Sequence, residues 1–186
     1  MRITSMLNRS SMRPAANSVE YYVYSSQGVL FEEQTSGMMM SNNKPGALAP
    51  TLNGMVPDDF RSEFETNYTL SVQVENFEKN MAFTLALPEE IDFGDEDPLC
   101  TGLTGNRGPL ICDANRSKKS LFFPNVFTFY DSNPGKIEIQ INPLRNPKTN
   151  LVTSSFLIST QTYDGYIMDT ITNGISINFY CEYPCA

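Results

Sequence analysis

Four cysteines carry the clearest chemistry of this chain, because their spacing favours disulfide bonds. They are Cys100, Cys112, Cys181 and Cys185, and they form two pairs that are each close in sequence. Of the three possible pairings we expect Cys100–Cys112 and Cys181–Cys185, since both close a local loop. A zinc site built from all four is the alternative, but only the second pair has the usual ligand spacing. Disulfides indicate an oxidising environment, and therefore an extracellular or cell-surface location.

An acidic stretch, residues 88–98, is a candidate metal site. It holds six carboxylates in eleven residues, and carboxylate oxygens are ligands that Ca²⁺ prefers. If calcium binds, we expect Asp92, Asp95 and Asp97 to be its ligands. The ligand spacing of an EF-hand is absent, however, and no helical pattern flanks the stretch. A solvated acidic loop is the simpler interpretation, so calcium is the only cofactor considered.

Histidine is absent from the chain, which removes the commonest general base and the commonest metal ligand. The cysteines would therefore lack a base to activate them as nucleophiles. Paired carboxylates need separate environments in a cleft to act as acid and base, which neighbours in one loop do not provide. We therefore expect no catalytic residues and no enzymatic activity.

The charge balance limits the partners of the chain. Thirteen basic and 21 acidic residues give a net charge of −8 at pH 7. Nucleic acids and anionic membrane surfaces are bound through clustered Lys and Arg, so neither is an expected partner. No stretch has the run of apolar residues that a membrane-spanning helix needs.

Three triplets match the acceptor pattern for N-linked glycans, Asn-x-Ser/Thr. Their asparagines are Asn8, Asn67 and Asn115. Asn115 is the best candidate because it lies in a polar loop, residues 113–120. Together with the cysteine pairs, these triplets are typical of a secreted glycoprotein.

From residue 64 onward the sequence predicts strands separated by turns. Apolar and polar residues alternate, which is the pattern of a half-buried strand. The segments concerned are residues 67–75, 81–87, 126–130, 136–141, 155–163 and 174–180. Their length and spacing predict an all-β fold, an antiparallel β-sandwich of the Ig-like or jelly-roll-like kind, over residues 61–186. One short helix is expected at residues 58–65, where Pro57-Asp58-Asp59 offers a start signal.

Part of this region resembles a known type of module. Ile141-Asn142-Pro143-Leu144 is followed by Ser154-Ser155-Phe156-Leu157-Ile158 and by Tyr163-Asp164-Gly165. These segments resemble the Asn-Pro turn, the Ser-Ser-Phe-x-Ile strand and the Tyr-Asp turn of β-sandwich repeats in extracellular and surface proteins of ciliates and related protists. The resemblance covers residues 137–179 and implies an extracellular, non-catalytic structural module. This chain holds one copy of the module rather than an array.

Residues 1–60 are expected to form an N-terminal arm and connector outside the sandwich. The arm contains strand candidates in residues 19–31, which are rich in aromatic and β-branched side chains. Residues 34–57, rich in Ser, Asn, Pro, Gly and Met, are expected only to connect. The residues expected to contact another subunit are Tyr21, Tyr22, Val23, Tyr24, Val29 and Phe31.

An isolated strand, a long connection and a sandwich form the layout of a chain that donates a strand to a neighbour. Because head-to-tail donation need not close on itself, it produces a filament. We therefore predict a structural subunit of an extracellular filament or surface fibre, which assembles with itself by donating its N-terminal strand. The alternative is a monomeric, secreted adhesion module that binds carbohydrate or calcium and whose arm packs on its own domain.

Overall fold

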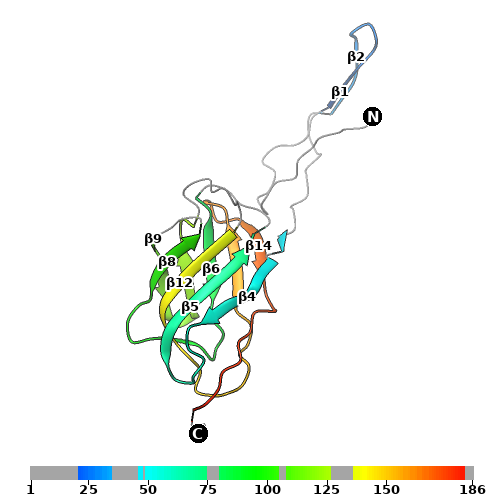
Figure 1. Cartoon of the computed structure of the whole chain (residues 1–186). Coiled ribbons are helices and arrows are strands. Elements are labelled where there is room, and N and C mark those ends of the chain that lie inside the picture. Colours follow the sequence, from blue (N-terminus) through cyan, green and yellow to red (C-terminus); the bar gives the residue numbers. More distant parts are fainter. Residues whose placement is uncertain are drawn as a thin grey trace.

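The computed structural model describes residues 21–34, 46–47, 49–74, 80–104, 108–126 and 136–182. Within these residues the chain forms two six-stranded sheets, packed as a sandwich, and a separate two-stranded hairpin (Figure 1). The fold is therefore all-β, as the alternating pattern predicts, and its sheets are antiparallel apart from one short parallel pair. This described part contains no α-helix, and so no helix long and apolar enough to cross a membrane.

One sheet is built largely from pairs of strands that are distant in sequence. Its order is β10-β11-β6-β13-β14-β3. The strands are β10 (Asp113–Asn115), β11 (Ser120–Phe123), β6 (Ala82–Ala86), β13 (Leu157–Gln161), β14 (Ile167–Ile171) and β3 (Gly46–Ala47). At its edge, β3 runs parallel to β14 and places Gly46 opposite Asp169 and Ala47 opposite Thr170.

The other sheet has the order β4-β5-β12-β8-β9, and a further strand, β7, pairs with the C-terminal end of β12. The strands are β4 (Ala49–Pro57), β5 (Glu65–Gln73), β12 (Lys136–Arg145), β8 (Leu99–Thr104), β9 (Gly108–Leu110) and β7 (Asp92–Phe93). β12 continues through a cis Asn142–Pro143 bond, where its register with β5 shifts. This long strand is the centre of the sheet, since it pairs with β5 on one side and with β8 and β7 on the other.

The core lies between the two sheets, because alternate side chains of each strand point to the same face. The buried side chains include Tyr68, Leu70, Val72, Ile137, Ile139 and Ile141 from one sheet and Phe83, Leu85, Leu121, Phe123 and Ile158 from the other. Phe83 on β6 and Phe123 on β11 meet edge to face, with ring centroids 5.7 Å apart. In a chain without Trp, Phe and Tyr supply the large core side chains.

Most of the predicted strands are confirmed. The segments at residues 67–75, 81–87 and 136–141 correspond to β5, β6 and β12, and the segment at 155–163 contains β13. Residues 127–130, most of another predicted strand, lie outside the described residues. The last segment, residues 174–180, is alternately buried and exposed and forms no named strand, but isolated bridges and main-chain hydrogen bonds join it to residues 151–156 and 60–62.

The prediction that residues 34–57 only connect is wrong for residues 46–57. β3 and β4 lie in this stretch and add an edge strand to each sheet, so the sandwich begins well before residue 61. The amino-acid composition does not predict these strands, because β4 is held by main-chain pairing with β5. Side-chain hydrophobicity contributes little to this pairing. The helix expected at residues 58–65 is also wrong, because Arg61 forms a β-bridge with Tyr180 of the C-terminal segment.

The hairpin consists of β1 (Tyr21–Tyr24) and β2 (Leu30–Gln34), which pair antiparallel. Its turn is closed by main-chain hydrogen bonds: Ser25 N donates to Val29 O at 2.8 Å and Gly28 N donates to Ser25 O at 3.0 Å. The hairpin projects away from the sandwich (Figure 1). β1 is therefore not the single free strand that was expected, because one of its edges is already paired with β2.

Gly54, at the irregular centre of β4, is expected to tolerate substitution less well than Gly174. Its φ is +65° and an added Cβ would lie 3.1 Å from Ile175 Cγ1, whereas Gly174 has a φ of +92° and open space around it. Both Gly54→Ala and Gly174→Ala strain the backbone, but only the first also overpacks the core. Gly54→Ala should therefore lower the free energy of unfolding by about 1 kcal/mol more than Gly174→Ala, measured by urea titration. Equal losses would show that Ile175 moves aside without cost.

Candidate functional site

The acidic loop, residues 88–98, pairs its carboxylates with separate cations. Lys119 Nζ lies 2.7 Å from Asp92 Oδ1, and Arg145 Nη2 lies 3.2 Å from Asp95 Oδ1. Lys119 lies in a turn and Arg145 lies in β12, so Asp92 and Asp95 face different elements of the fold. The described residues contain no group of three or more His, Cys, Asp or Glu side chains that could hold a metal ion.

Arg116 holds the third predicted ligand and the loop backbone together. Its guanidinium lies 3.1 Å from Asp97 Oδ1, and its Nη1 donates to Gly94 O at 3.0 Å. The structure therefore does not bring Asp92, Asp95 and Asp97 together as a calcium site; it uses them as anchors that fix the loop against its neighbours.

The Cys100–Cys112 disulfide is present and joins β8 to the segment that follows β9. The two cysteines are 12 positions apart in sequence, and their bond closes the loop that contains the β8–β9 hairpin. Cys181 is also disulfide-bonded, while its expected partner Cys185 lies outside the described residues. The structure thus contains the oxidised cysteines that the spacing predicts, and none of the described cysteines is free.

The three glycosylation candidates differ in their surroundings. Asn115 is exposed at the start of the short 3₁₀ helix η1 (Arg116–Lys118), where its Oδ1 accepts hydrogen bonds from Lys118 N at 3.0 Å and Ser117 Oγ at 2.9 Å. Asn67 is half-buried within β5, and its Nδ2 donates to Asp58 Oδ2 at 3.0 Å. Asn8 lies outside the described residues. Asn115 therefore stays the best candidate for a glycan, because its side chain faces solvent.

At one end of the sandwich, a buried asparagine organises residues 58–64, here called the base loop. Asn146 is 2% exposed, and its Nδ2 donates to Asp59 O at 2.8 Å and Arg61 O at 2.7 Å. Its Oδ1 accepts a hydrogen bond from the hydroxyl of Tyr68, and burial raises the pKa of that hydroxyl. Every polar atom of the Asn146 side chain is thereby used, as a buried amide requires.

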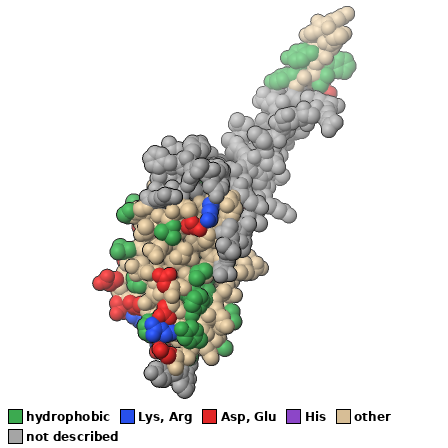
Figure 2. Space-filling model, viewed as in Figure 1, with side chains coloured by type: hydrophobic (Ala, Val, Ile, Leu, Met, Phe, Trp, Pro, Cys, Tyr) green, Lys and Arg blue, Asp and Glu red, His purple; other side chains and the backbone are tan. Residues whose placement is uncertain are grey.

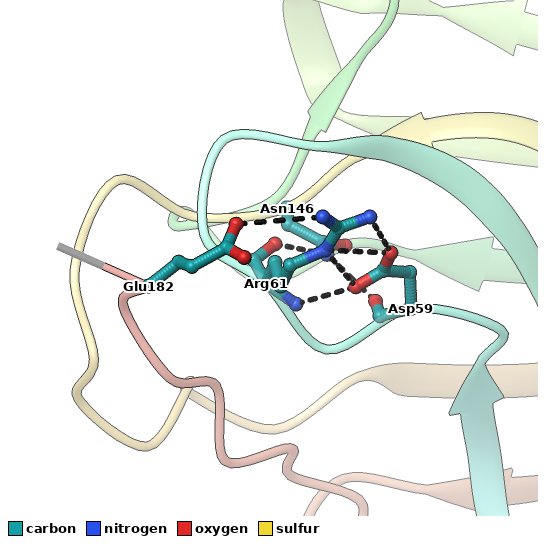
Figure 3. Close-up of polar contacts among 4 residues, drawn as sticks. All are labelled: Asp59, Arg61, Asn146 and Glu182. Atoms are coloured by element: carbon teal, nitrogen blue, oxygen red, sulfur yellow. Dashed lines mark hydrogen bonds and ion pairs between the residues drawn. The ribbon is translucent and has the colours of Figure 1, made fainter.

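Charged side chains close the same loop from outside (Figure 3). Arg61 Nε donates to Asp59 Oδ2 at 2.9 Å and Arg61 Nη2 donates to the same oxygen at 2.6 Å, while Arg61 Nη1 reaches Glu182 Oε2 at 3.4 Å. The guanidinium also stacks over the ring of Phe64, 3.8 Å from its centroid. Sequence reasoning missed this cluster because Asn146 and Glu182 lie far in sequence from Asp59 and Arg61, and the set matches no short motif. It is a structural anchor for the base loop rather than a reactive site.

The hairpin exposes the residues that were expected to contact another subunit. Tyr22, Tyr24, Val29 and Phe31 are 47%, 60%, 62% and 81% exposed, and Leu30, which was not predicted, is also exposed. Figure 2 shows hydrophobic side chains on the projecting hairpin. Tyr21 and Val23 lie on the same hairpin, so all six predicted residues belong to one small element.

Comparisons with known proteins give matches of shape only. No protein-family model matches the chain, and no curated protein matches it. Solved structures that resemble it include BslA, a bacterial hydrophobin, at 12% identity and a TM-score of 0.43, covering 73% of this chain and 98% of that one. The collagen binding domain of the Erysipelothrix rhusiopathiae surface protein RspB matches at 10% identity and a TM-score of 0.36, covering 85% of this chain and 54% of that one.

A third resemblance is to BcpA, the major pilin subunit of Bacillus cereus, at 10% identity and a TM-score of 0.36, covering 80% of this chain and 44% of that one. The chain thus spans about half the length of the second structure and less than half of the third. At such identities the function is argued from the residues of this chain. None of the comparisons concerns ciliate or protist repeats, so that resemblance stays a prediction.

Calcium is expected to leave the stability of the protein unchanged. Asp92, Asp95 and Asp97 already have cationic partners, and a bound Ca²⁺ would have to displace several of them to gather its ligands. Thermal unfolding of the full chain should therefore show the same midpoint with millimolar calcium as with a chelator. A calcium-dependent rise in the midpoint that disappears in Asp95→Asn would contradict this prediction.

Acid is expected to weaken the base loop. The hydrogen bond from Arg61 holds the pKa of Asp59 below its usual value of 3.8. Because the folded pKa is depressed, the stabilisation is present above the unfolded value and is lost as the pH falls through the folded value. Below about pH 5, the free energy of unfolding should therefore fall less steeply with decreasing pH in Asp59→Asn than in the wild type. Urea titrations at a series of pH values measure the two slopes, and identical slopes would count against the assignment.

Proposed function

We propose that the chain is a structural, non-catalytic subunit of an extracellular filament or surface fibre, in which subunits assemble head to tail through the N-terminal hairpin. The observation that carries this proposal is the hairpin itself. β1 and β2 pair with each other, project from the sandwich (Figure 1) and expose their apolar side chains. Exposed apolar side chains on such an element are suited to contact with another subunit.

The size of the hairpin supports the need for a partner. A two-stranded hairpin alone is marginally stable at best in water, and needs a third strand or a packing surface. Its exposed aromatic and aliphatic side chains present on the order of 500 Å² of surface to water. A standard protein–protein interface buries about 800 Å² on each partner. The hairpin side chains and one strand edge together therefore supply most of the area of a stable interface.

The cysteines and the glycan acceptor support the location. A disulfide that closes the β8–β9 hairpin persists in oxidising surroundings and is rare in the cytosol. An exposed Asn115 in an acceptor triplet suits the same compartment. Both features fit a secreted subunit that assembles with copies of itself, with N-glycans at its surface.

Assembly should fail when the hairpin loses its apolar side chains. In the full chain, Tyr24→Ser combined with Phe31→Ser removes two of the most exposed hairpin side chains while leaving the sandwich intact. We expect the wild type to form polymers that sedimentation velocity and electron microscopy detect, and the double variant to stay monomeric with an unchanged unfolding midpoint.

The matched control removes similar apolar surface elsewhere. Leu99, the first residue of β8, and Ile111, which follows β9, are 75% and 69% exposed, so Leu99→Ser with Ile111→Ser should polymerise like the wild type. A wild-type chain that stays monomeric at every concentration would overturn the proposal and favour the monomeric adhesion module instead.

A further inference from the structure

The sandwich carries its own group of exposed apolar side chains, here called the base patch, at the end where the base loop lies. Its members come from three segments that are distant in sequence. They are Phe60 and Phe64 of the base loop, Leu151 and Val152 of the segment before β13, and Tyr180 of the C-terminal segment. Figure 2 shows hydrophobic side chains beside charged ones toward this end of the sandwich.

Main-chain pairing joins these segments into one surface. Arg61 of the base loop forms a parallel bridge with Tyr180, and Val152 forms an antiparallel bridge with Asn178. Because alternate residues of an extended segment point to the same face, the side chain of Tyr180 lies on the face of Asn178 and is a diagonal neighbour of Val152. The two side chains are 55% and 59% exposed, so they form a continuous apolar surface.

The aromatic rings of the base loop are held in place by contacts within the subunit. The ring of Phe60 packs on the buried ring of Phe179, with centroids 6.3 Å apart, and the guanidinium of Arg61 lies 3.8 Å from the centroid of Phe64. The main chain of the loop is fixed by the amide of Asn146. A partner that binds the base patch therefore does not have to order the loop first, which lowers the entropic cost of binding.

The base patch and the hairpin lie at opposite ends of β4. The chain enters the sandwich at β3 and β4, and the base loop follows at the other end of β4. Nine strand residues span roughly 30 Å. In Figure 1 the hairpin projects from one end of the sandwich, and the C-terminal segment, drawn in red, runs to the other. Two different apolar surfaces at opposite ends are what a head-to-tail contact between copies requires.

The area of the base patch matches that of the hairpin. An aromatic side chain buries about 150–250 Å² when it is fully covered, so the exposed fractions of the five base-patch residues correspond to on the order of 500 Å². The exposed side chains of the hairpin present a similar area. Contact between the two surfaces would bury about 1,000 Å² in total, which is the area that a specific interface needs.

We propose that the base patch receives the hairpin of a second copy of this chain, which names the acceptor in the assembly proposed above and rests on that proposal. The contact is made by side chains: Tyr24, Val29 and Phe31, all 60% or more exposed, pack against Val152 and Tyr180 of the next copy. Aromatic residues are enriched at the centre of such interfaces.

The length of the connection favours a second copy over the hairpin of the same chain. Residues 35–45, between β2 and β3, span at most about 40 Å when fully extended. Docking on the base patch of the same subunit would use most of this length, since β4 alone spans roughly 30 Å. It would also restrict the backbone of every residue in the connection, which costs conformational entropy. Docking on a second copy requires no such extension.

Assembly should weaken when the base patch loses its apolar side chains. Val152→Ser combined with Tyr180→Ser should keep the unfolding midpoint of the wild type, because both side chains are more than half exposed. Sedimentation velocity should show at least about tenfold weaker assembly. The matched control is Leu103→Ser with Tyr163→Ser, two exposed residues outside the base patch, and it should polymerise like the wild type.

Mixing two variants tests the pairing of the two surfaces directly. The variant with Val152→Ser and Tyr180→Ser keeps its hairpin, and the variant with Tyr24→Ser and Phe31→Ser keeps its base patch. Each variant alone should stay monomeric. Their equimolar mixture should form dimers but no polymers, because the dimer uses the only intact hairpin and the only intact base patch.

The outcomes separate the acceptor from the function of the hairpin. If the wild type polymerises and depends on Tyr24 and Phe31, yet the base-patch variant also polymerises, the acceptor is wrong and the hairpin function stands. A mixture that forms no dimers, or a base-patch variant with a lowered unfolding midpoint, would also overturn the acceptor, because the patch would then serve its own subunit. If the wild type does not polymerise, both proposals fail.

Discussion

The structure depends on one buried side chain, the amide of Asn146, whose polar atoms all form hydrogen bonds. A buried amide must find partners for all its polar atoms, or its desolvation destabilises the fold. Asn146 finds them in the main chain of Asp59 and Arg61 and in the hydroxyl of Tyr68. These contacts fix the base loop between β4 and β5. The base loop in turn pairs with Tyr180 of the C-terminal segment.

Ion pairs also fix a loop in place, the acidic loop of residues 88–98. The excess of acidic residues suggests a surface that binds cations, yet the best-placed carboxylates are paired with Lys119, Arg116 and Arg145. Exposed ion pairs of this kind contribute little to stability individually. Their effect here is geometric, since three cations from separate elements hold the acidic loop against β12 and the turn after η1.

The proposed assembly follows from how the N-terminal third of the chain is divided. β3 and β4 complete the sandwich, one in each sheet. The hairpin before them carries aromatic and aliphatic side chains that are exposed and are not part of the sandwich core. The same third of the chain therefore contributes both to the sandwich and to the proposed assembly.

The sequence by itself determined the all-β class, most core strands, the Cys100–Cys112 pair and the exposed aromatic residues of the arm, because these follow from period-two alternation and local spacing. Only the tertiary structure decided that residues 46–57 belong to the sandwich, that β1 is paired with β2, and that Asp92, Asp95 and Asp97 face different cations. The hydrogen bonds of Asn146 could not be predicted from the sequence either. The physical reason is that main-chain pairing and buried polar contacts join residues far apart in sequence, and neither leaves a periodic pattern in the residues it uses.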